Sequence, residues 1–243
     1  MEKAIYKRVI IKLSGEALLD EKDGTIFDRT KLDGVGSIVE RIHGMGVDVG
    51  IVVGAGNIWR GRMAAKIGIE PATADYMGMM GTIINAMAIQ NAVEQRGLEC
   101  RVMSSINVPQ VCEPYIRRKA VHHLDKGRIV IFAGGTGNPF FTTDSCATLR
   151  ALEVGADAIL MGKNGVDGVY NKDPRKNKDA KLIENLSFHE VVEKKLQVMD
   201  LTAVAMLEGK GVVIRVFNMD DPENFIRVIR GDKIGTIIAN EEE

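Results

Sequence analysis

The chain has 243 residues, of which 45% are hydrophobic and 27% are charged, and its formal net charge is −1. This is the composition of a globular protein large enough for one α/β domain or two lobes, and the balanced charge argues against binding to nucleic acid or an anionic membrane. No apolar run approaches the roughly 20 residues of a membrane span, and the first residues lack the apolar core of a signal peptide. Three scattered cysteines show no metal-ligand spacing, so we expect a cytoplasmic protein with reduced thiols and without nucleic-acid or membrane partners.

The first predicted strand, residues 6–13, is apolar except near its end, where it carries Lys12 before a glycine-containing turn. A lysine in such a place is costly to bury unless an anion meets it, so Lys12 either faces a phosphate or lies exposed at a strand edge. The polar segment 20–25 predicts a surface loop. Asp28 predicts the N-cap of a helix that ends near residues 44–46.

A second strand, 47–53, leads into a glycine-rich corner, 54–61, which contains Arg60. Two glycines separated by one residue are a weak signal alone. A dinucleotide-binding fingerprint would need a third glycine and a helix directly afterwards, and the sequence predicts neither. The corner therefore gains meaning only together with other glycine-rich corners of the chain.

A long helix is predicted from residue 71 to about residue 95, and it carries a stripe of small residues at spacings of three and four. The stripe consists of Gly78, Gly81, Asn85, Ala88 and Ala92, flanked by Met77, Met80, Ile84 and Met87. Small residues let another element approach closely, and methionines pack adaptably beside it. The stripe either packs against the core of the same chain or forms a subunit interface, and the sequence leaves both open.

Strands are predicted at 100–104 and 129–133, with a helix at about 115–124 between them. Arg101 and Arg128 open these adjacent strands. This order predicts that both arginines lie at the amino-terminal rim of the sheet, and the alternative is that they are ordinary solvated arginines.

The segment 134–144 organises the rest of the chain. It follows a buried strand, contains three glycines and three threonines, and precedes a helix predicted at 145–154. Backbone amides and hydroxyls at a strand-to-helix corner form a cradle for an anion. An ordinary turn would need neither two adjacent phenylalanines nor paired threonines before an aspartate.

Beyond a strand at 158–161 the sequence changes in character. Up to this strand, strands and helices alternate, which predicts right-handed crossovers and a mostly parallel sheet. From residue 162 turn-forming and charged residues accumulate, so we place a soft lobe boundary there. Ser187 with Glu190 predicts a capping box for a helix to about 195, Asp200 caps a helix at 201–210, a strand follows at 212–217, a short helix starts at 222, and a last strand covers 235–239.

Three glycine-rich corners at the carboxyl ends of parallel strands should meet at one edge of the sheet. They bring together the cations Lys12 and Arg60, with Lys163 as a further candidate, and the hydroxyls of Ser14, Thr136, Thr142 and Thr143. The histidines, His43, His122, His123 and His189, belong to other segments, so histidine acid–base hydrolysis is not supported. A cation-rich and base-poor site favours phosphoryl transfer, although the Walker and protein-kinase motifs are absent.

Five motifs carry a resemblance to a known family: Lys12-Leu13-Ser14-Gly15-Glu16, Gly54-Ala55-Gly56-Asn57 with Arg60, Thr136-Gly137-Asn138-Pro139-Phe140-Phe141-Thr142-Thr143-Asp144, Val166-Asp167-Gly168-Val169-Tyr170, and Arg215-Val216-Phe217-Asn218. From about residue 6 to residue 238 the chain resembles the bacterial uridylate (UMP) kinases of the amino acid kinase fold. The first and fourth motifs are common to that fold. The segment 138–144 looks like the UMP kinases and not their amino-acid-phosphorylating relatives.

The resemblance implies a single domain, 1–243, with a three-layer αβα sandwich around a mostly parallel sheet. It also implies a UMP-binding lobe at about 1–161 and an ATP-binding lobe at about 162–243. The implied reaction is the reversible, Mg²⁺-dependent transfer of the ATP γ-phosphoryl group to UMP in pyrimidine nucleotide biosynthesis. The acceptor phosphate is already ionised, so no general base is needed; Lys12 and Arg60 would neutralise the moving group, and Asp144 would orient Lys12 or a magnesium-bound water.

Carried over position by position, the resemblance also implies two sets of binding residues. Those for ATP are Lys12, Leu13, Ser14, Gly15, Gly56, Arg60, Asn164, Tyr170 and Asp173. Those for UMP are Ala55, Asp75, Thr136, Gly137, Asn138, Pro139, Phe140, Phe141, Thr142 and Thr143. Protein ligands to a metal are not predicted.

Regulation and assembly are further implications of the resemblance. The family suggests a homohexamer, a trimer of dimers formed through the helix at 75–95, with GTP as activator and UTP as inhibitor. A GTP effect would be sought at Asp20, Glu21, Lys22, Asp23, Gly24, Thr25, Arg101 and Arg128.

Two alternatives remain. One is a small-metabolite kinase of the same fold, such as an acetylglutamate or carbamate kinase, which 138–144 and Asp75 disfavour. The other is a non-catalytic nucleotide-binding or storage protein, against which the joint presence of Lys12, Arg60, Asp144 and Asp173 argues.

Overall fold

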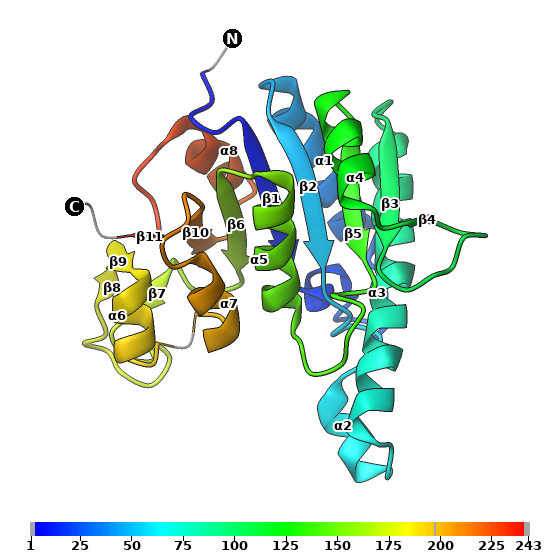
Figure 1. The fold of residues 1–243 in the computed structure, drawn as a ribbon. Coiled ribbons are helices and arrows are strands. Elements are labelled where there is room, and N and C mark those ends of the chain that lie inside the picture. The colour runs from blue at the N-terminus through cyan, green and yellow to red at the C-terminus, as the bar shows by residue number, and fades with distance from the viewer. Residues whose placement is uncertain (1–2, 197, 241–243) are drawn as a thin grey trace.

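A computed structural model of the protein describes residues 3–196 and 198–240 (Figure 1). The main sheet contains β1 (Arg8–Leu13), β2 (Asp48–Val53), β3 (Cys100–Ser104), β4 (Glu113–Pro114), β5 (Ile129–Ala133), β6 (Ala158–Lys163), β9 (Asn185–Ser187), β10 (Val213–Asn218) and β11 (Thr236–Ala239), and β7 (Val169–Tyr170) pairs with β8 (Leu182–Ile183) in a separate hairpin. The helices are η1 (Gly15–Leu18), α1 (Arg29–Gly44), α2 (Gly61–Lys66), α3 (Pro71–Glu94), α4 (Arg117–Asp125), α5 (Thr143–Val154), α6 (Phe188–Glu193), α7 (Leu201–Leu207) and α8 (Glu223–Arg230).

The strand order in the main sheet is β4-β3-β5-β2-β1-β6-β10-β11-β9. All neighbouring pairs are parallel except β10 with β11. The predicted mostly parallel sheet is therefore confirmed. After β1 the chain builds outward on one side through β2, and it later returns to the other side of β1 with β6. The carboxyl end of β1 thus lies at a change of direction, where open α/β sheets bind ligands.

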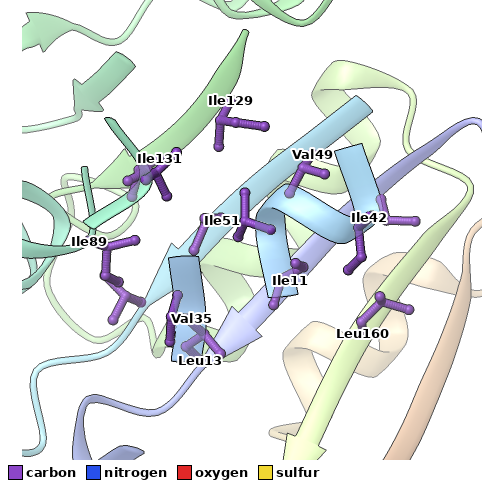
Figure 2. Packing of buried hydrophobic residues seen from close by; sticks show 14 of the residues in the cluster. Ile11, Leu13, Val35, Ile42, Val49, Ile51, Ile89, Ile129, Ile131 and Leu160 are labelled. Atoms are coloured by element: carbon purple, nitrogen blue, oxygen red, sulfur yellow. The ribbon is translucent and has the colours of Figure 1, made fainter. Parts of the chain in front are cut away.

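Helices cover both faces of the sheet, and alternate side chains of β1 supply both halves of the core. On one face Val9, Ile11 and Leu13 pack with residues of α1, α3 and α8. On the other face Ile10 packs with residues of α4, α5, α6 and α7. Figure 2 shows part of the first cluster, in which side chains of β1, β2 and β5 meet α1 and α3. This is the expected three-layer sandwich.

Helix N-caps largely follow the sequence prediction. The Asp28 carboxylate accepts hydrogen bonds from the amides of Thr30 and Lys31 at the start of α1. Ser187 and Glu190 form both halves of the capping box of α6, and Asp200 caps α7. These local side-chain interactions satisfy amides that a helix cannot pair internally.

Several boundaries differ from the prediction. α5 begins at Thr143 and not at residue 145, because Thr142 caps it by accepting from the amides of Asp144 and Ser145. α6 ends at Glu193, not near 195, and α7 ends at Leu207, before the predicted end at 210. As expected, no helix follows Gly54 and Gly56 directly, because a turn at 56–58 comes before α2, but α2 itself was not predicted. α2 has only 6 residues, too few to display a helical repeat.

The small-residue stripe of α3 faces the interior of the same chain. A Cβ atom on Gly81 would lie 2.9 Å from the Ala55 Cβ atom, and Asn85 Nδ2 donates to the Gly54 carbonyl at 2.7 Å. Close helix packing therefore explains these residues, as one of the two alternatives predicted. The opposite face of α3 is apolar and exposed: it carries Tyr76, Met77, Met80, Ile84 and Met87.

The described residues form no helix that is long and apolar enough to cross a bilayer. Cys100, Cys112 and Cys146 are free and buried, and burial raises the pKa of Cys100 to about 12. Such a thiol is a poor nucleophile at neutral pH. Met1 and Glu2, which open the segment in which we found no signal peptide, lie outside the described residues.

Candidate active site

Three glycine-rich corners meet at the carboxyl edge of the sheet, as predicted. A Cβ atom on Gly15 would lie 2.5 Å from Asn57 Oδ1 and 2.7 Å from the Gly54 carbonyl oxygen. A Cβ atom on Gly54 would lie 3.4 Å from the hydroxyl of Thr143. The first corner, at Ser14-Gly15, therefore touches the second corner, 54–61. The second corner in turn touches the third corner, 134–144. Only glycine fits at position 15, because the backbone of the second corner occupies the space of a side chain.

An ion pair lies where the corners meet. Lys12 at the end of β1 places its Nζ 2.8 Å from Oδ1 of Asp144 in the first turn of α5. The two side chains are only 16% and 19% exposed. The contact has the distance of an ion pair without the angles of a hydrogen bond, so Oδ1 keeps unused acceptor capacity. Lys12 is thus oriented by Asp144 and is not an exposed edge lysine.

Lys163, at the end of the neighbouring strand β6, adds a second cation to this pair. Burial lowers the pKa of Lys163, the nearby Lys12 lowers it further, and Asp144 opposes both effects. The Lys163 ammonium donates to the Val198 carbonyl at 3.2 Å. Asp144 forms its ion pair with Lys12, and no carboxylate of the described residues lies within ion-pair distance of Lys163, so the positive charge of Lys163 is unpaired. A bound anion would complete this arrangement, because buried charge is stable only when it is paired.

Arg60 lies at the second corner. Its Nη2 is 2.7 Å from Glu16 Oε1, and its Nε donates to the Gly56 carbonyl at 3.1 Å. The pair with Glu16 is solvent-exposed, with 36% and 52% of the two side chains accessible. Exposed ion pairs contribute little to stability, about 0–1 kcal/mol. Arg60 can therefore exchange Glu16 for a ligand at small cost.

One cavity, of about 280 Å³, lies between α3 and the second and third corners, and we call it the α3 cavity. It is lined by Ala55, Gly56, Trp59, Gly61, Ala74, Asp75, Gly78, Met79, Thr82, Gly135, Phe141, Thr142 and Thr143. Five of the residues predicted to bind UMP are among them: Ala55, Asp75, Phe141, Thr142 and Thr143. The remaining five, 136–140, form the loop beyond Gly135 and do not line the cavity.

Asp75 connects α3 with that loop. Its Oδ2 accepts a hydrogen bond of 2.7 Å from the amide of Phe140, a residue with a φ of 71°. A positive φ is strained for phenylalanine, so the bond to Asp75 helps to hold the loop in this form. One carboxylate oxygen of Asp75 is occupied in this way, and the other is available to a ligand.

A second cavity, of about 500 Å³, lies beside the β7–β8 hairpin, and we call it the hairpin cavity. Lys163, Tyr170 and Asp173 are among its lining residues, whereas the predicted Asn164 is not. Lys163 borders the hairpin cavity, and Thr143, next to Asp144, borders the α3 cavity. The Lys12–Asp144 pair therefore lies between the two cavities.

Sequence reasoning missed several residues of the site. The unpredicted residues that line the α3 cavity are Trp59, Gly61, Ala74, Gly78, Met79, Thr82 and Gly135. Asp200 was identified only as a helix cap, yet it also accepts hydrogen bonds from the hydroxyls of Thr142 and Ser145. Gly135 lies within the segment 134–144, which was already predicted to cradle an anion, so it could have been included among the predicted binding residues. Asp200 carried no such signal, because it is remote from the third corner in sequence.

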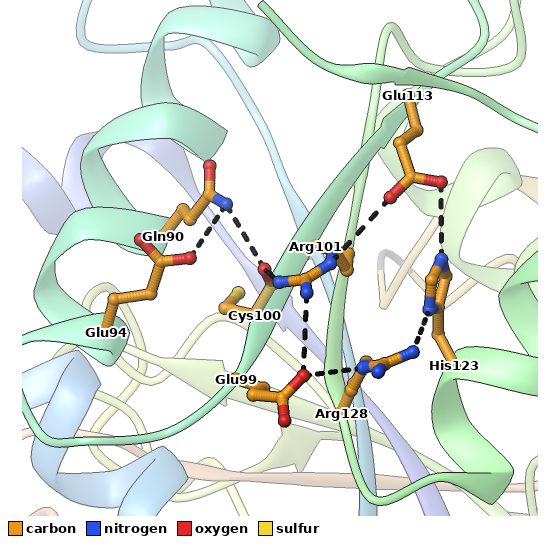
Figure 3. A network of polar contacts seen from close by, with 8 residues as sticks. All are labelled: Gln90, Glu94, Glu99, Cys100, Arg101, Glu113, His123 and Arg128. Carbon is orange, nitrogen blue, oxygen red and sulfur yellow. Dashed lines mark hydrogen bonds and ion pairs between the residues drawn. The ribbon is translucent and has the colours of Figure 1, made fainter.

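The residues predicted for a GTP effect fall into two separate places within this chain. The loop 20–25 follows η1 at the carboxyl edge of the sheet, where Asp20 Oδ1 accepts from the amide of Lys22 at 2.8 Å. Arg101 and Arg128 lie near the amino ends of β3 and β5, as predicted. Figure 3 shows them in a polar network in which both bind Glu99 and His123 joins Arg128 to Glu113.

The chain resembles known proteins along almost its whole length. The model of the amino acid kinase family matches residues 7–218. The uridylate kinase of Deinococcus radiodurans is 51% identical over 239 residues, which cover 98% of this chain and 97% of that protein. The crystal structure of UMP kinase from Bacillus anthracis matches with a TM-score of 0.94 and 44% identity, covering 98% of this chain and 97% of that one. The UMP kinase structure from Ureaplasma parvum matches with a TM-score of 0.91 and 38% identity, covering 99% and 100%. The chain belongs to the amino acid kinase family and, within it, to the uridylate kinases.

Proposed function

We propose that the protein catalyses the reversible transfer of the γ-phosphoryl group from ATP to UMP, giving ADP and UDP, as a step in the synthesis of UTP and CTP. The observation that carries this proposal is the Lys12–Asp144–Lys163 cluster between two cavities. A phosphoryl group passing from one nucleotide to another needs such an excess of positive charge midway. The membership among uridylate kinases supports UMP as acceptor.

The two cavities divide the substrates. ATP would lie with its adenosine in the hairpin cavity, near Tyr170 and Asp173, and with its phosphates over the Ser14-Gly15 turn. UMP would lie in the α3 cavity, with its ribose at Asp75 and its phosphate toward Thr142 and Thr143. This assignment puts the adenosine of ATP in the lobe at about 162–243 and UMP in the lobe at about 1–161, with the ATP phosphates reaching the Ser14-Gly15 turn of the first lobe.

The chemistry then rests on positioning and charge neutralisation. A UMP phosphate oxygen is ionised near neutral pH, so it can attack without a general base. No histidine lines either cavity among the described residues. Lys12 and Arg60 would neutralise the negative charge of the moving phosphoryl group, and Asp144 would hold Lys12 in place.

We include Mg²⁺ in the proposal, bound through the phosphates of ATP. The described residues contain no cluster of three or more His, Cys, Asp or Glu side chains that could hold a metal. The free acceptor capacity of Asp144 Oδ1 fits a water molecule of a hydrated magnesium ion instead. When bound, Mg²⁺ would supply further neutralisation of the triphosphate charge.

We further propose that the exposed face of α3 forms a dimer contact within a homohexamer, and that GTP activates and UTP inhibits. The five exposed apolar side chains from Tyr76 to Met87 support the contact, because a surface of this kind is usually covered by a partner. Within one chain the loop 20–25 lies at the carboxyl ends of the strands, whereas Arg101 and Arg128 lie at their amino ends. A shared GTP site would therefore require neighbouring subunits.

The experiment that tests the reaction is a coupled ADP-release assay with MgATP and, in parallel, UMP, CMP, dUMP, acetylglutamate and carbamate. We expect turnover with UMP far above the others. Turnover with acetylglutamate or carbamate would replace the proposal by a small-metabolite kinase. ATP binding without turnover on any acceptor would indicate a storage or regulatory protein.

A further inference from the structure

Arg150 of α5 lies directly behind the third corner and lines neither cavity. It is a buried residue, with 3% of its surface exposed. Its Nη2 donates to the hydroxyl of Ser105 at 2.7 Å and to the carbonyl of Gly135 at 3.4 Å. The Ser105 hydroxyl in turn donates to the same carbonyl at 3.0 Å. Two donors therefore hold one carbonyl oxygen of the turn that borders the α3 cavity.

The guanidinium itself is held rigidly. It stacks on the ring of Tyr115, with 3.7 Å between Cζ and the ring centroid. Glu153 Oε2 accepts from Arg150 Nη1 and from the Tyr115 hydroxyl. Burial raises the pKa of Tyr115, so its hydroxyl remains a donor at all physiological pH values. The position of Arg150 is thus determined by α5, Tyr115 and Glu153 together.

A purely structural role explains this arginine poorly. Its Nε is buried without a hydrogen-bond partner among the described residues. Burying an arginine costs free energy, and apolar residues of similar volume often stabilise a core at least as well. The contact with the Gly135 carbonyl is the one that reaches the site.

The contact with the Gly135 carbonyl also fixes the direction of the next backbone N–H, that of Thr136. In a planar trans peptide the C=O of Gly135 and the N–H of Thr136 point in opposite directions. The carbonyl is taken up on the side of Arg150, so the Thr136 N–H points away from Arg150. This N–H donates no hydrogen bond within the described part of the chain. From the other side, the Thr82 hydroxyl accepts from the amide of Gly134 at 2.8 Å.

We propose that Arg150 is a positioning residue for the acceptor: through Ser105 and Gly135 it orients the Gly135–Thr136 peptide so that the Thr136 N–H, at the rim of the α3 cavity beside the lining residue Gly135, is a fixed donor to the bound nucleotide. This inference rests on the proposed function, because it identifies that nucleotide as UMP. Arg150 acts through the backbone and does not touch the substrate.

The first test measures the turn without any ligand. Hydrogen exchange of residues 133–140 is compared in wild type, Arg150→Lys and, as a matched control, Arg215→Lys. Arg215 is equally buried, at 2% exposed, but lies in β10 and binds the Asp232 carbonyl. We expect exchange of the Gly134 and Gly137 amides to rise by about tenfold in Arg150→Lys alone.

The second test measures the acceptor kinetics. In Arg150→Lys we expect kcat/KM for UMP to fall by about ten- to a hundredfold, while KM for ATP changes by less than about twofold. Ser105→Ala, at a half-buried position, removes the bridging hydroxyl without removing a buried charge. We expect Ser105→Ala to raise KM for UMP and so to lower kcat/KM for UMP, by a smaller factor than Arg150→Lys does. If Arg150→Lys does not fold, Ser105→Ala alone tests the proposal.

The outcomes separate the two proposals. No turnover of UMP by the wild type would refute the proposed function. The exchange measurement would still test whether Arg150 holds the turn at 133–140, because it needs no ligand. Normal turnover by the wild type, with unchanged exchange or unchanged KM for UMP in both Arg150→Lys and Ser105→Ala, would overturn the role of Arg150 alone.

Discussion

Replacing Lys12 with methionine separates the catalytic role of this lysine from its structural role. Methionine keeps much of the length of lysine and removes its charge. The Lys12–Asp144 distance of 2.8 Å corresponds to a gross attraction of about 6 kcal/mol at an effective dielectric constant of about 20. The desolvation of both groups offsets most of this energy.

The loss of stability should stay small because Lys163 remains. Removing one partner of an isolated buried pair costs about 3–5 kcal/mol, but Asp144 also interacts favourably with Lys163. The variant also loses the repulsion between the two lysines. We therefore expect the free energy of unfolding to fall by less than about 2 kcal/mol.

The loss of rate should be larger. A preorganised donor aimed at charge that develops in the transition state is worth about 10²–10³ in kcat, or about 3–4 kcal/mol. We thus expect kcat of Lys12→Met to fall by this factor while the Kd for UMP changes by less than about threefold. Coupled ADP release gives kcat, calorimetry gives the Kd, and thermal unfolding gives stability. Lys7→Met, at an exposed position just before β1, is the control. A kcat within about fivefold of wild type would refute the role of Lys12.

Three further predictions follow from packing and charge. Gly81→Ala should destabilise the protein by about 0–2 kcal/mol, because overpacking against Ala55 outweighs the gain in helix propensity, and adding Ala55→Gly should restore stability; additive effects in this double-mutant cycle would contradict the contact. Met80→Glu should break the proposed α3 contact and lower the mass measured by light scattering, whereas Met63→Glu on α2 should not; an unchanged mass for Met80→Glu would argue against the interface. Lys163→Met should raise Tm at pH 7 and weaken ATP binding, because burial of the charged Lys163 lowers its pKa and costs stability in the wild type. This cost is fully present below the lowered pKa of the folded state and vanishes as pH rises toward 10.5, so the gain in Tm should shrink near pH 10.5. The same gain in Tm at pH 7 and near pH 10.5 would contradict this explanation.

The sequence predicted those parts of the protein that depend on local signals. Buried apolar runs mark the central strands, and glycines after each run mark the corners, so the parallel sheet and its ligand-binding edge could be expected. Lys12 and Asp144 were placed in the site by motif, but their direct contact joins residues far apart in the chain. The same is true of Asp75 and the Phe140 amide.

Other features depend on tertiary packing alone. Arg150 looks like an ordinary helix charge in the sequence, and only the packing of α5 against Tyr115 buries it. Helix α2 and the β7–β8 hairpin are too short to display a repeat. The small-residue stripe of α3 could be assigned either to packing within the chain or to a subunit interface. The spacing shows that the small residues share one face of the helix, but it does not show which element packs against that face.

Helix α3 is a two-sided element. One side carries Gly78, Met79 and Thr82 to the wall of the α3 cavity, and the other presents methionines to the outside. The two sides are separated by a helix diameter of about 10 Å. Figure 1 shows α3 running past the carboxyl edge of the sheet, and the Thr82 hydroxyl ties it to the amide of Gly134. If the proposed dimer contact forms on the outer side of α3, any shift of the helix in that contact would also move Gly78, Met79 and Thr82, and through Thr82 the amide of Gly134, so the contact and the α3 cavity would share one helix.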